Sequence, residues 1–205
     1  MKLLLVNGSP RAGGNSDFVQ DLLRQTSSNA GLEVREVRLR EQIVGACCGC
    51  SRCHDGKGVC SMSDDFSSRI SALIIESDSL ILISPVYQGG VTGRMKNFMD
   101  RCEVFRKGRV LKGKLCGGVA IGGYPGGGQE LTLMQIQYFA HICAMRYVAS
   151  WGKQRSHLGG HCIAYERGEV AKDSEGLESA KNVVTELYNL FSSLRDVTMK
   201  PGDQK

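Results

Sequence analysis

The sequence contains no long apolar run and no segment typical of a targeting signal. None of its apolar stretches approaches the roughly eighteen residues that cross a membrane. Near the N-terminus only Leu3 to Val6 are continuously apolar, far fewer than the apolar region of a signal peptide. We therefore expect a cytoplasmic protein without a membrane partner. The odd count of nine cysteines agrees, because it argues against a disulfide framework and for a reducing compartment.

The sequence also lacks a concentration of charge of one sign. Its 26 Lys and Arg and 21 Asp and Glu leave a formal net charge of +5, and the basic residues are scattered rather than striped. This pattern gives no footprint of nucleic-acid binding. The length of 205 residues suggests one domain, which we expect over 1–195, followed by a polar tail over 196–205.

Apolar segments of strand type alternate with segments of helical periodicity. The expected strands are Leu3–Val6, Val34–Leu39, Leu80–Ile83, Gly117–Ile121 and Tyr147–Trp151, of which the second has the charged neighbours of an edge strand. Apolar residues at helical intervals predict helices around 18–23, 70–74, 133–140 and 177–194. Continuous apolar strands separated by helices indicate a parallel sheet covered on both faces. The sequence thus predicts an α/β fold with a doubly wound, five-stranded parallel sheet and a cysteine-rich insertion over 45–65 after the second strand.

In such a sheet ligands bind at the carboxyl ends of the strands, and the first loop there is typical of a phosphate site. Residues 7–16, Asn-Gly-Ser-Pro-Arg-Ala-Gly-Gly-Asn-Ser, follow the first strand and open a helix whose start offers free N–H groups. Ser9, Arg11 and Ser16 add donors, and Asn15 or Ser16 is the expected helix N-cap. The loop matches neither the Gly-x-x-x-x-Gly-Lys-Ser/Thr of nucleotide triphosphatases nor the Gly-x-Gly-x-x-Gly of dinucleotide-binding proteins. An ordinary turn with a helix cap remains the alternative.

Two further loops at this edge, Ser84–Gly90 and Gly122–Glu130, combine backbone amides with a tyrosine. Amides can hydrogen-bond the edge of a planar, partly polar ring system while a tyrosine bounds its face. Each loop alone is also consistent with a flexible turn. Together with the phosphate loop they indicate flavin mononucleotide (FMN). The candidate FMN-binding residues are Ser9, Arg11, Asn15, Ser16, Pro85, Val86, Tyr87, Gln88, Gly89, Gly122, Tyr124, Gly127 and Gly128.

Five of the nine cysteines lie between residues 47 and 60. Cys47, Cys50 and Cys53 are separated by regular two-residue gaps, and Cys60 can return to complete four thiolates, the ligand number of a 4Fe-4S cluster. We expect these four as ligands and Cys48 as a spare thiol. Structural zinc is the second interpretation, although it usually uses two separated Cys-x-x-Cys pairs. The Cys-x-x-Cys-His string within the run also matches c-type haem attachment, which requires export, and free thiols are the plainest alternative.

The remaining cysteines are Cys102, Cys116, Cys143 and Cys162. They lie among apolar residues or glycines, so we expect them to be small core side chains. The four histidines are spread along the chain, and no residue is assigned a catalytic role.

Several of these motifs together resemble a known family. They are the loop at 7–16, the Cys-x-Gly-Cys-x-x-Cys run closing at Cys60 with Asp64-Asp65 after it, Ser84–Tyr87, Gly93–Arg101 and Gly127–Glu130. In this combination the chain resembles the flavodoxin-like NADPH-dependent FMN reductase superfamily over residues 1 to about 195. Within it, the cysteine spacing is similar to that of the iron–sulfur flavoproteins.

The resemblance implies a flavodoxin-like fold, FMN in the three loops, a 4Fe-4S cluster on the four named cysteines, and dimers or tetramers with FMN near a subunit interface. It implies an oxidoreductase that passes electrons between a one-electron donor such as ferredoxin and a two-electron acceptor, whether oxygen, peroxide, a quinone or a small metabolite. The alternatives are an NAD(P)H-dependent FMN or quinone reductase without a working cluster, an FMN-dependent dehydrogenase of a small cyclic metabolite, and a non-catalytic electron carrier or redox sensor.

We also expect a homo-oligomer whose contacts are made by helices rather than strand edges. Met95, Phe98 and Met99 stand in a polar context over Gly93–Arg101, and the segment Leu133–Met145 has apolar residues on more than one helical face. That is more apolar surface than a single contact with a sheet would cover.

Overall fold

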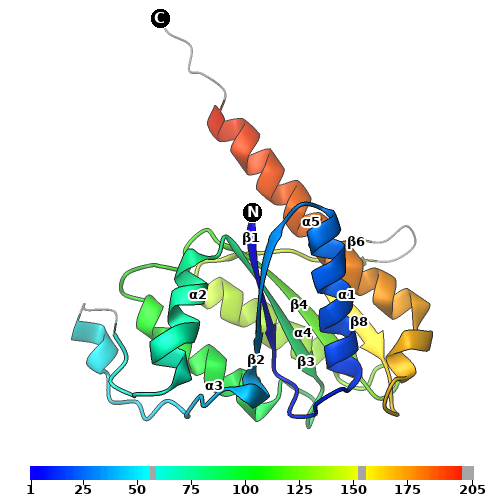
Figure 1. The fold of residues 1–205 in the computed structure, drawn as a ribbon, viewed down its shortest axis with the longest axis horizontal. Coiled ribbons are helices and arrows are strands. Elements are labelled where there is room, and N and C mark those ends of the chain that lie inside the picture. The colour runs from blue at the N-terminus through cyan, green and yellow to red at the C-terminus, as the bar shows by residue number, and fades with distance from the viewer. Residues whose placement is uncertain (56–58, 152–155, 200–205) are drawn as a thin grey trace, which may run out of the picture.

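Parallel strands form the centre of the molecule (Figure 1), whose computed structural model describes residues 1–55, 59–151 and 156–199. The strands of the main sheet are β1 (Lys2–Asn7), β2 (Glu33–Arg38), β3 (Ser79–Pro85), β4 (Leu115–Gly122), β5 (Arg146–Tyr147) and β8 (Gly160–Ile163), while β6 (Ser150–Trp151) pairs only with β7 (Ser156–His157). The helices are α1 (Asn15–Asn29), α2 (Ser71–Glu76), α3 (Gly93–Arg101), α4 (Gln129–Ile142) and α5 (Ser174–Met199). Short helical turns are η1 (Leu39–Glu41), η2 (Arg52–Asp55), η3 (Phe66–Ile70), η4 (Cys102–Phe105) and η5 (Glu169–Lys172).

The strand order is β2-β1-β3-β4-β5, and every pairing along it is parallel. This confirms the expected doubly wound sheet, with β2 at one edge as its charged residues predict. The cysteine-rich segment follows β2, also as expected.

The sheet is buried on both faces because consecutive apolar residues in β1 point to opposite sides. Leu4 and Val6 pack in a core with residues of α2, α3 and α4, whereas Leu3 and Leu5 pack in a second core with residues of α1 and α5. Figure 1 shows α2 and α3 on one side of the strands and α1 and α5 on the other. All four side chains are fully buried, which explains why the strand has no polar alternation.

The fifth strand position differs from the expected Tyr147–Trp151. Only the two residues of β5 pair with the start of β4, and β8 pairs with its end, from Val119 to Gly122. A glycine allows this close return of the chain, since a Cβ on Gly159 would lie 2.3 Å from the carbonyl oxygen of Gly118. The sequence does not predict β8, because its four residues include a glycine and a histidine and so do not form a continuous apolar run.

The expected helices are all present, and the last one continues through Met199. The division into a domain over 1–195 and a tail over 196–205 stays a prediction, and residues 200–205 lie outside the described part. No helix among the described residues is long and apolar enough to cross a membrane. Of the cysteines outside the 47–60 run, Cys143 is half-buried and the other three are buried.

Candidate functional site

Three loops meet at the carboxyl ends of β1, β3 and β4, and backbone and hydroxyl groups join them. The first loop is tied to β3 by the Gly8 N–H, which donates to the Ile83 carbonyl at 2.8 Å. The Thr92 hydroxyl, at the start of α3, donates to the Gly8 carbonyl at 2.7 Å. The Val86 N–H of the second loop donates to the Ile121 carbonyl of β4 at 2.9 Å. The parallel sheet therefore gathers the expected cofactor loops at one edge.

The conformation of the first loop is held by side chains that accept hydrogen bonds from backbone N–H groups of the loop itself. The Asn7 side-chain oxygen accepts from the Ser9 N–H at 2.8 Å, and the Ser9 hydroxyl accepts from the Arg11 N–H at 3.2 Å. The Asp17 carboxylate accepts from the Gly13 N–H at 2.6 Å. The Arg11 side chain is exposed, and its guanidinium has no partner among the described residues. The loop thus holds the Arg11 backbone while leaving its charge available to a ligand.

Neither Asn15 nor Ser16 caps α1, contrary to expectation, because the helix begins at Asn15 and Gly14 occupies the cap position without a side-chain bond. The Asn15 amide instead donates to the Glu166 carbonyl and accepts from the Gly168 N–H, each at 2.8 Å. Asn15 therefore joins the phosphate loop to the loop after β8. Ser16 is largely buried, and its hydroxyl makes no hydrogen bond to any described residue, which leaves it available to a bound group.

Two arginines that the sequence does not single out support this loop. Arg167 donates through Nε to the Gly13 carbonyl at 3.1 Å and through a terminal nitrogen to the Ala12 carbonyl. Arg40 pairs with the Asp17 carboxylate at 2.7 Å. Because Asp17 lies in the first turn of α1, an unpaired carboxylate there would repel an anion, and Arg40 removes that repulsion.

The second loop is a tight turn in which two backbone N–H groups bond to carbonyls of the same turn. The Tyr87 N–H donates to the Gly90 carbonyl at 2.9 Å, and the Gly90 N–H donates to the Tyr87 carbonyl at 3.1 Å. Gln88 and Gly89 occupy the middle positions with φ of 51° and 74°, the left-handed conformations of a type I′ turn. Tyr87 itself is 41% exposed at the base of the turn.

The third loop lies against the second. Gly128 has a φ of 99°, and a Cβ there would lie 3.0 Å from a Val86 methyl and 3.1 Å from the Gly89 Cα. The buried Gln129 amide donates to the Tyr124 carbonyl at 2.9 Å, while its Oε1 has no partner among the described residues. Leaving a buried acceptor without a donor costs free energy. We therefore expect the Gln129 Oε1 to accept a hydrogen bond from a bound group or a water molecule.

The other predicted residues of these loops lie where expected. Pro85 and Gly122 are the last residues of β3 and β4, and the Gly127 N–H turns inward to the Tyr124 carbonyl at 3.0 Å. The exposed Tyr165, from the loop after β8, lies against Gly123, where a Cβ would come within 3.2 Å of its ring. No local pattern in the sequence predicts this third tyrosine at the site.

The cysteine-rich segment presents its thiols at the surface. Cys47, Cys48 and Cys50 are exposed, whereas Cys53 and Cys60 are half-buried against the core on the α3 side. The Cys50 thiol lies 3.4 Å from the Ser61 hydroxyl, and this contact, together with hydrogen bonds from the Arg52 backbone and the Cys48 side chain, lowers the pKa of Cys50 to about 7. Within the described part, which omits 56–58, no three metal-ligating side chains surround one point.

The pKa of the Cys53 thiol reflects its burial and the acidic groups of its neighbourhood. Burial raises the pKa of the Cys53 thiol, and the negative charges of Glu103, Cys60 and Cys47 raise it further. A positively charged centre among these sulfurs would remove the repulsion. The ligand set Cys47, Cys50, Cys53 and Cys60 nevertheless stays a prediction.

A buried ion pair closes the base of this segment. The guanidinium of Arg101, on α3, makes two hydrogen bonds to the Asp64 carboxylate, at 2.5 and 2.9 Å, and others to the Gly45 carbonyl and the Ser67 hydroxyl. Burial alone would lower the pKa of Arg101, but hydrogen bonding to Asp64 and the negative charge of Cys60 raise it overall. Burial likewise opposes ionisation of Asp64, yet Arg101 and the N–H groups of Gly45 and Ser67 lower its pKa.

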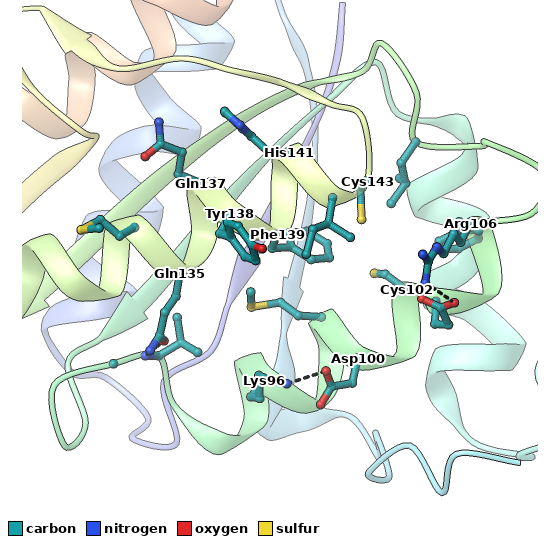
Figure 2. Close-up of a pocket in the computed structure, with 18 of the residues that line it drawn as sticks. Lys96, Asp100, Cys102, Arg106, Gln135, Gln137, Tyr138, Phe139, His141 and Cys143 are labelled. Atoms are coloured by element: carbon teal, nitrogen blue, oxygen red, sulfur yellow. Dashed lines mark hydrogen bonds and ion pairs between the residues drawn. The ribbon is translucent and has the colours of Figure 1, made fainter. Parts of the chain in front are cut away.

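A cavity of about 1450 Å³ extends from the second loop along the groove between α4 and the α3–η4 segment. Figure 2 shows Tyr138 and Cys143 on the α4 side facing Asp100, Cys102 and Arg106 on the other. Apolar side chains dominate the groove, while basic residues stand along its length. The cavity is suited to bind an apolar molecule or an apolar protein surface next to the second loop.

The comparisons with known proteins agree with this geometry. The model of the family described as NADPH-dependent FMN reductase matches residues 1–153. An iron–sulfur flavoprotein of Methanocaldococcus jannaschii is 34% identical over 89% of this chain and 93% of its own length. An iron–sulfur flavoprotein of Archaeoglobus fulgidus is 37% identical over 100% of this chain and 86% of its own length.

Solved structures share the fold at lower sequence identity. A flavodoxin, WrbA-like protein from Agrobacterium tumefaciens superimposes with a TM-score of 0.65 at 16% identity, over 94% of this chain and 98% of that one. An NADH:FMN oxidoreductase has the same TM-score at 14% identity, over 92% and 89% of the two chains. With the family match and the relatives above, these findings show that the chain is a flavodoxin-like, flavin-dependent oxidoreductase and belongs to the NADPH-dependent FMN reductase family.

Proposed function

We propose that this protein holds FMN in its three loops and a 4Fe-4S cluster on Cys47, Cys50, Cys53 and Cys60, and that it passes electrons between a one-electron donor such as ferredoxin and a two-electron acceptor. When bound, the cluster supplies single-electron transfer and FMN supplies one- and two-electron transfer, so the pair can interconvert the two kinds of step. The observation that carries the proposal is the run of five thiols over 47–60, three exposed and two half-buried against the core, in a flavodoxin-like fold with a separate candidate phosphate loop.

The residues at the loops fit FMN. The exposed Arg11 guanidinium and the free Ser16 hydroxyl are suited to hold the phosphate, together with the N–H groups that open α1. The turn at Gln88 and Gly89 leaves open space beside Gly89, and Tyr124 in the third loop is 63% exposed. These groups would bind the flavin edge and bound its face while excluding water from one side.

Anaerobic purification followed by iron, acid-labile sulfide, zinc and flavin analysis tests the cofactor proposal. Replacing any one of the four proposed ligands by serine should lower the iron content and the broad visible absorption without removing FMN. Cys48→Ser is the matched control and should keep both cofactors. Stoichiometric zinc without sulfide would contradict the cluster and favour an NAD(P)H-dependent FMN or quinone reductase. Turnover with reduced ferredoxin and with NAD(P)H then distinguishes the donors.

A homo-oligomer formed through α4 is part of the proposal. Its residues Leu131, Met134, Tyr138 and Ile142 are each more than half exposed and lie three or four positions apart, on one helical face. By contrast Met95 and Phe98 on α3 are fully buried within the chain, so α3 offers less apolar surface than its sequence predicts.

Sedimentation tests this interface. Tyr138→Glu should shift the protein towards monomer, because a carboxylate would be placed in an apolar contact. Ile75→Glu, at a residue of α2 that is 53% exposed, is the control and should leave the assembly unchanged. Monomeric wild-type protein at micromolar concentration would contradict the proposal.

A further inference from the structure

The side chains of the buried ion pair between Arg101 and Asp64 make no hydrogen bond to the three candidate cofactor loops among the described residues. The side chains are 1% and 6% exposed. Removing one partner of such a pair leaves a buried charge unpaired, which is strongly destabilising. A pair of this kind is therefore a strong constraint on the segments that supply it.

Those segments are the two ends of the cysteine-rich insertion. Asp64 follows the last cysteine of the run and accepts a hydrogen bond from the Gly45 N–H at 3.0 Å. Arg101 donates to the Gly45 carbonyl at 3.2 Å, so both residues also hold the chain just before the first cysteine. The next residue, Asp65, joins the same two ends of the segment, because its carboxylate accepts a hydrogen bond from the Ile43 N–H at 2.6 Å. The segment with all five thiols is thus a loop closed at its base on α3.

The same guanidinium lies at the base of the loop that carries the expected cluster ligands, and one of these, the half-buried Cys60, packs against the same core cluster as Phe66. Cys60 is the second negative group, after Asp64, that stabilises the charge of Arg101. The Arg101 Nε–H is buried and has no hydrogen-bond partner among the described residues. The Phe66 ring covers the guanidinium at 4.8 Å from its centroid, which excludes water and strengthens the interaction with nearby charge.

We propose that Arg101 is a positioning residue of the cysteine-rich loop: with Asp64 it closes the loop, and its positive charge beside Cys60 raises the reduction potential of the cluster that the loop holds. This inference rests on the proposed function, since it concerns the same cluster. Reduction adds negative charge to a cluster, and a fixed cation next to a ligand sulfur favours the more negative state. Removing the guanidinium should therefore lower the midpoint potential.

Two readouts test the two halves of this inference in the full-length protein. The first is the midpoint potential of the cluster in anaerobically purified protein, measured by optical titration. Arg101→Met should lower it, and Arg101→Lys should retain most of the wild-type value because it keeps the charge. Arg94→Met is the matched control on the same helix, since among the described residues the Arg94 side chain donates only to the Leu39 carbonyl, and this change should leave the potential unaltered.

The second readout is hydrogen exchange at the Gly45, Asp65 and Ser67 amides in protein stripped of metal. Arg101→Met and Asp64→Asn should each make these amides exchange roughly 100-fold faster, because either change leaves a buried charge unpaired. Unchanged exchange would overturn the closure of the loop, and an unchanged potential at full iron content would overturn the electrostatic role. If the wild-type protein holds no cluster, the proposed function fails while the exchange experiment still decides the closure.

Discussion

Replacing Arg11 with alanine should weaken the binding of FMN and leave the fold intact. Arg11 is exposed at the phosphate loop, and its side chain makes no bond to the described residues. Its backbone is held separately, through the Ser9 hydroxyl at 3.2 Å. Loss of the side chain therefore removes a ligand contact without removing a structural one.

The size of the effect follows from the exposure of this charge. Two unit charges about 4 Å apart attract by ~1 kcal/mol in bulk water and by ~4 kcal/mol at the effective dielectric of a protein surface. Arg11 is open to solvent on one side and faces the start of α1 on the other, so ~1.5–2 kcal/mol is expected, or a 10- to 30-fold higher Kd for FMN. Added salt should reduce the difference, since exposed charges are screened.

Quenching of flavin fluorescence on titration of the apoprotein measures this change. Riboflavin, which has the ring but no phosphate, is the control ligand, and its affinity should be the same for Arg11→Ala and wild type. Arg11→Lys should recover much of the FMN affinity because it restores a positive charge. An equal loss for FMN and riboflavin, or no loss for either, would refute the assignment of Arg11 to the phosphate.

Three other outcomes follow from the geometry. Gly128→Ala should lower both Tm and FMN affinity, because its φ of 99° costs an L-residue about 1–2 kcal/mol and the added Cβ presses on the second loop, whereas Gly93→Ala has open space and should be neutral in the same melting and titration experiments. A thiol reagent at pH 8 should label the exposed Cys47, Cys48 and Cys50 quickly in metal-free protein and the three buried thiols only on unfolding, and equal rates counted by mass spectrometry would contradict their burial. Because Arg101 outweighs burial and lowers the pKa of Asp64, the stability difference between wild type and Asp64→Asn in urea should be constant from about pH 7 to 5 and shrink below about pH 4 as the carboxylate protonates.

The sheet and the loops at its edge were predictable because their signals are local. Leu3–Val6 and Leu80–Ile83 are continuous apolar runs, and a strand buried on both faces needs nothing else. The fifth strand position was not predictable, because it is shared by two short segments. The pairing of β8 with β4 depends on the close approach of Gly159 to the Gly118 carbonyl more than on apolar content, and this approach is visible only in three dimensions.

At the site, the loop residues that we propose to contact a ligand are apparent in the sequence, whereas the residues that support the loop are not. The glycines and Arg11 stand together in one loop, so their shared purpose is visible in the sequence. Arg167 and Thr92 bind the same loop from more than eighty residues away, and no periodicity connects them to it. Asn15 was interpreted as a cap because Asn often has that role, but its bonds to the loop after β8 outweigh the local preference.

Arg11 and Arg101 differ in burial and pairing, which the sequence does not reveal. Arg11 and Arg101 both stand beside groups that are suited to a cofactor, yet the first is exposed and unpaired while the second is buried and makes two hydrogen bonds to Asp64. An exposed guanidinium can release a ligand at modest cost, whereas a buried one cannot leave its partner. We therefore expect Arg11 to set how tightly FMN is held, and Arg101 to fix a loop and a local charge that stay constant through turnover.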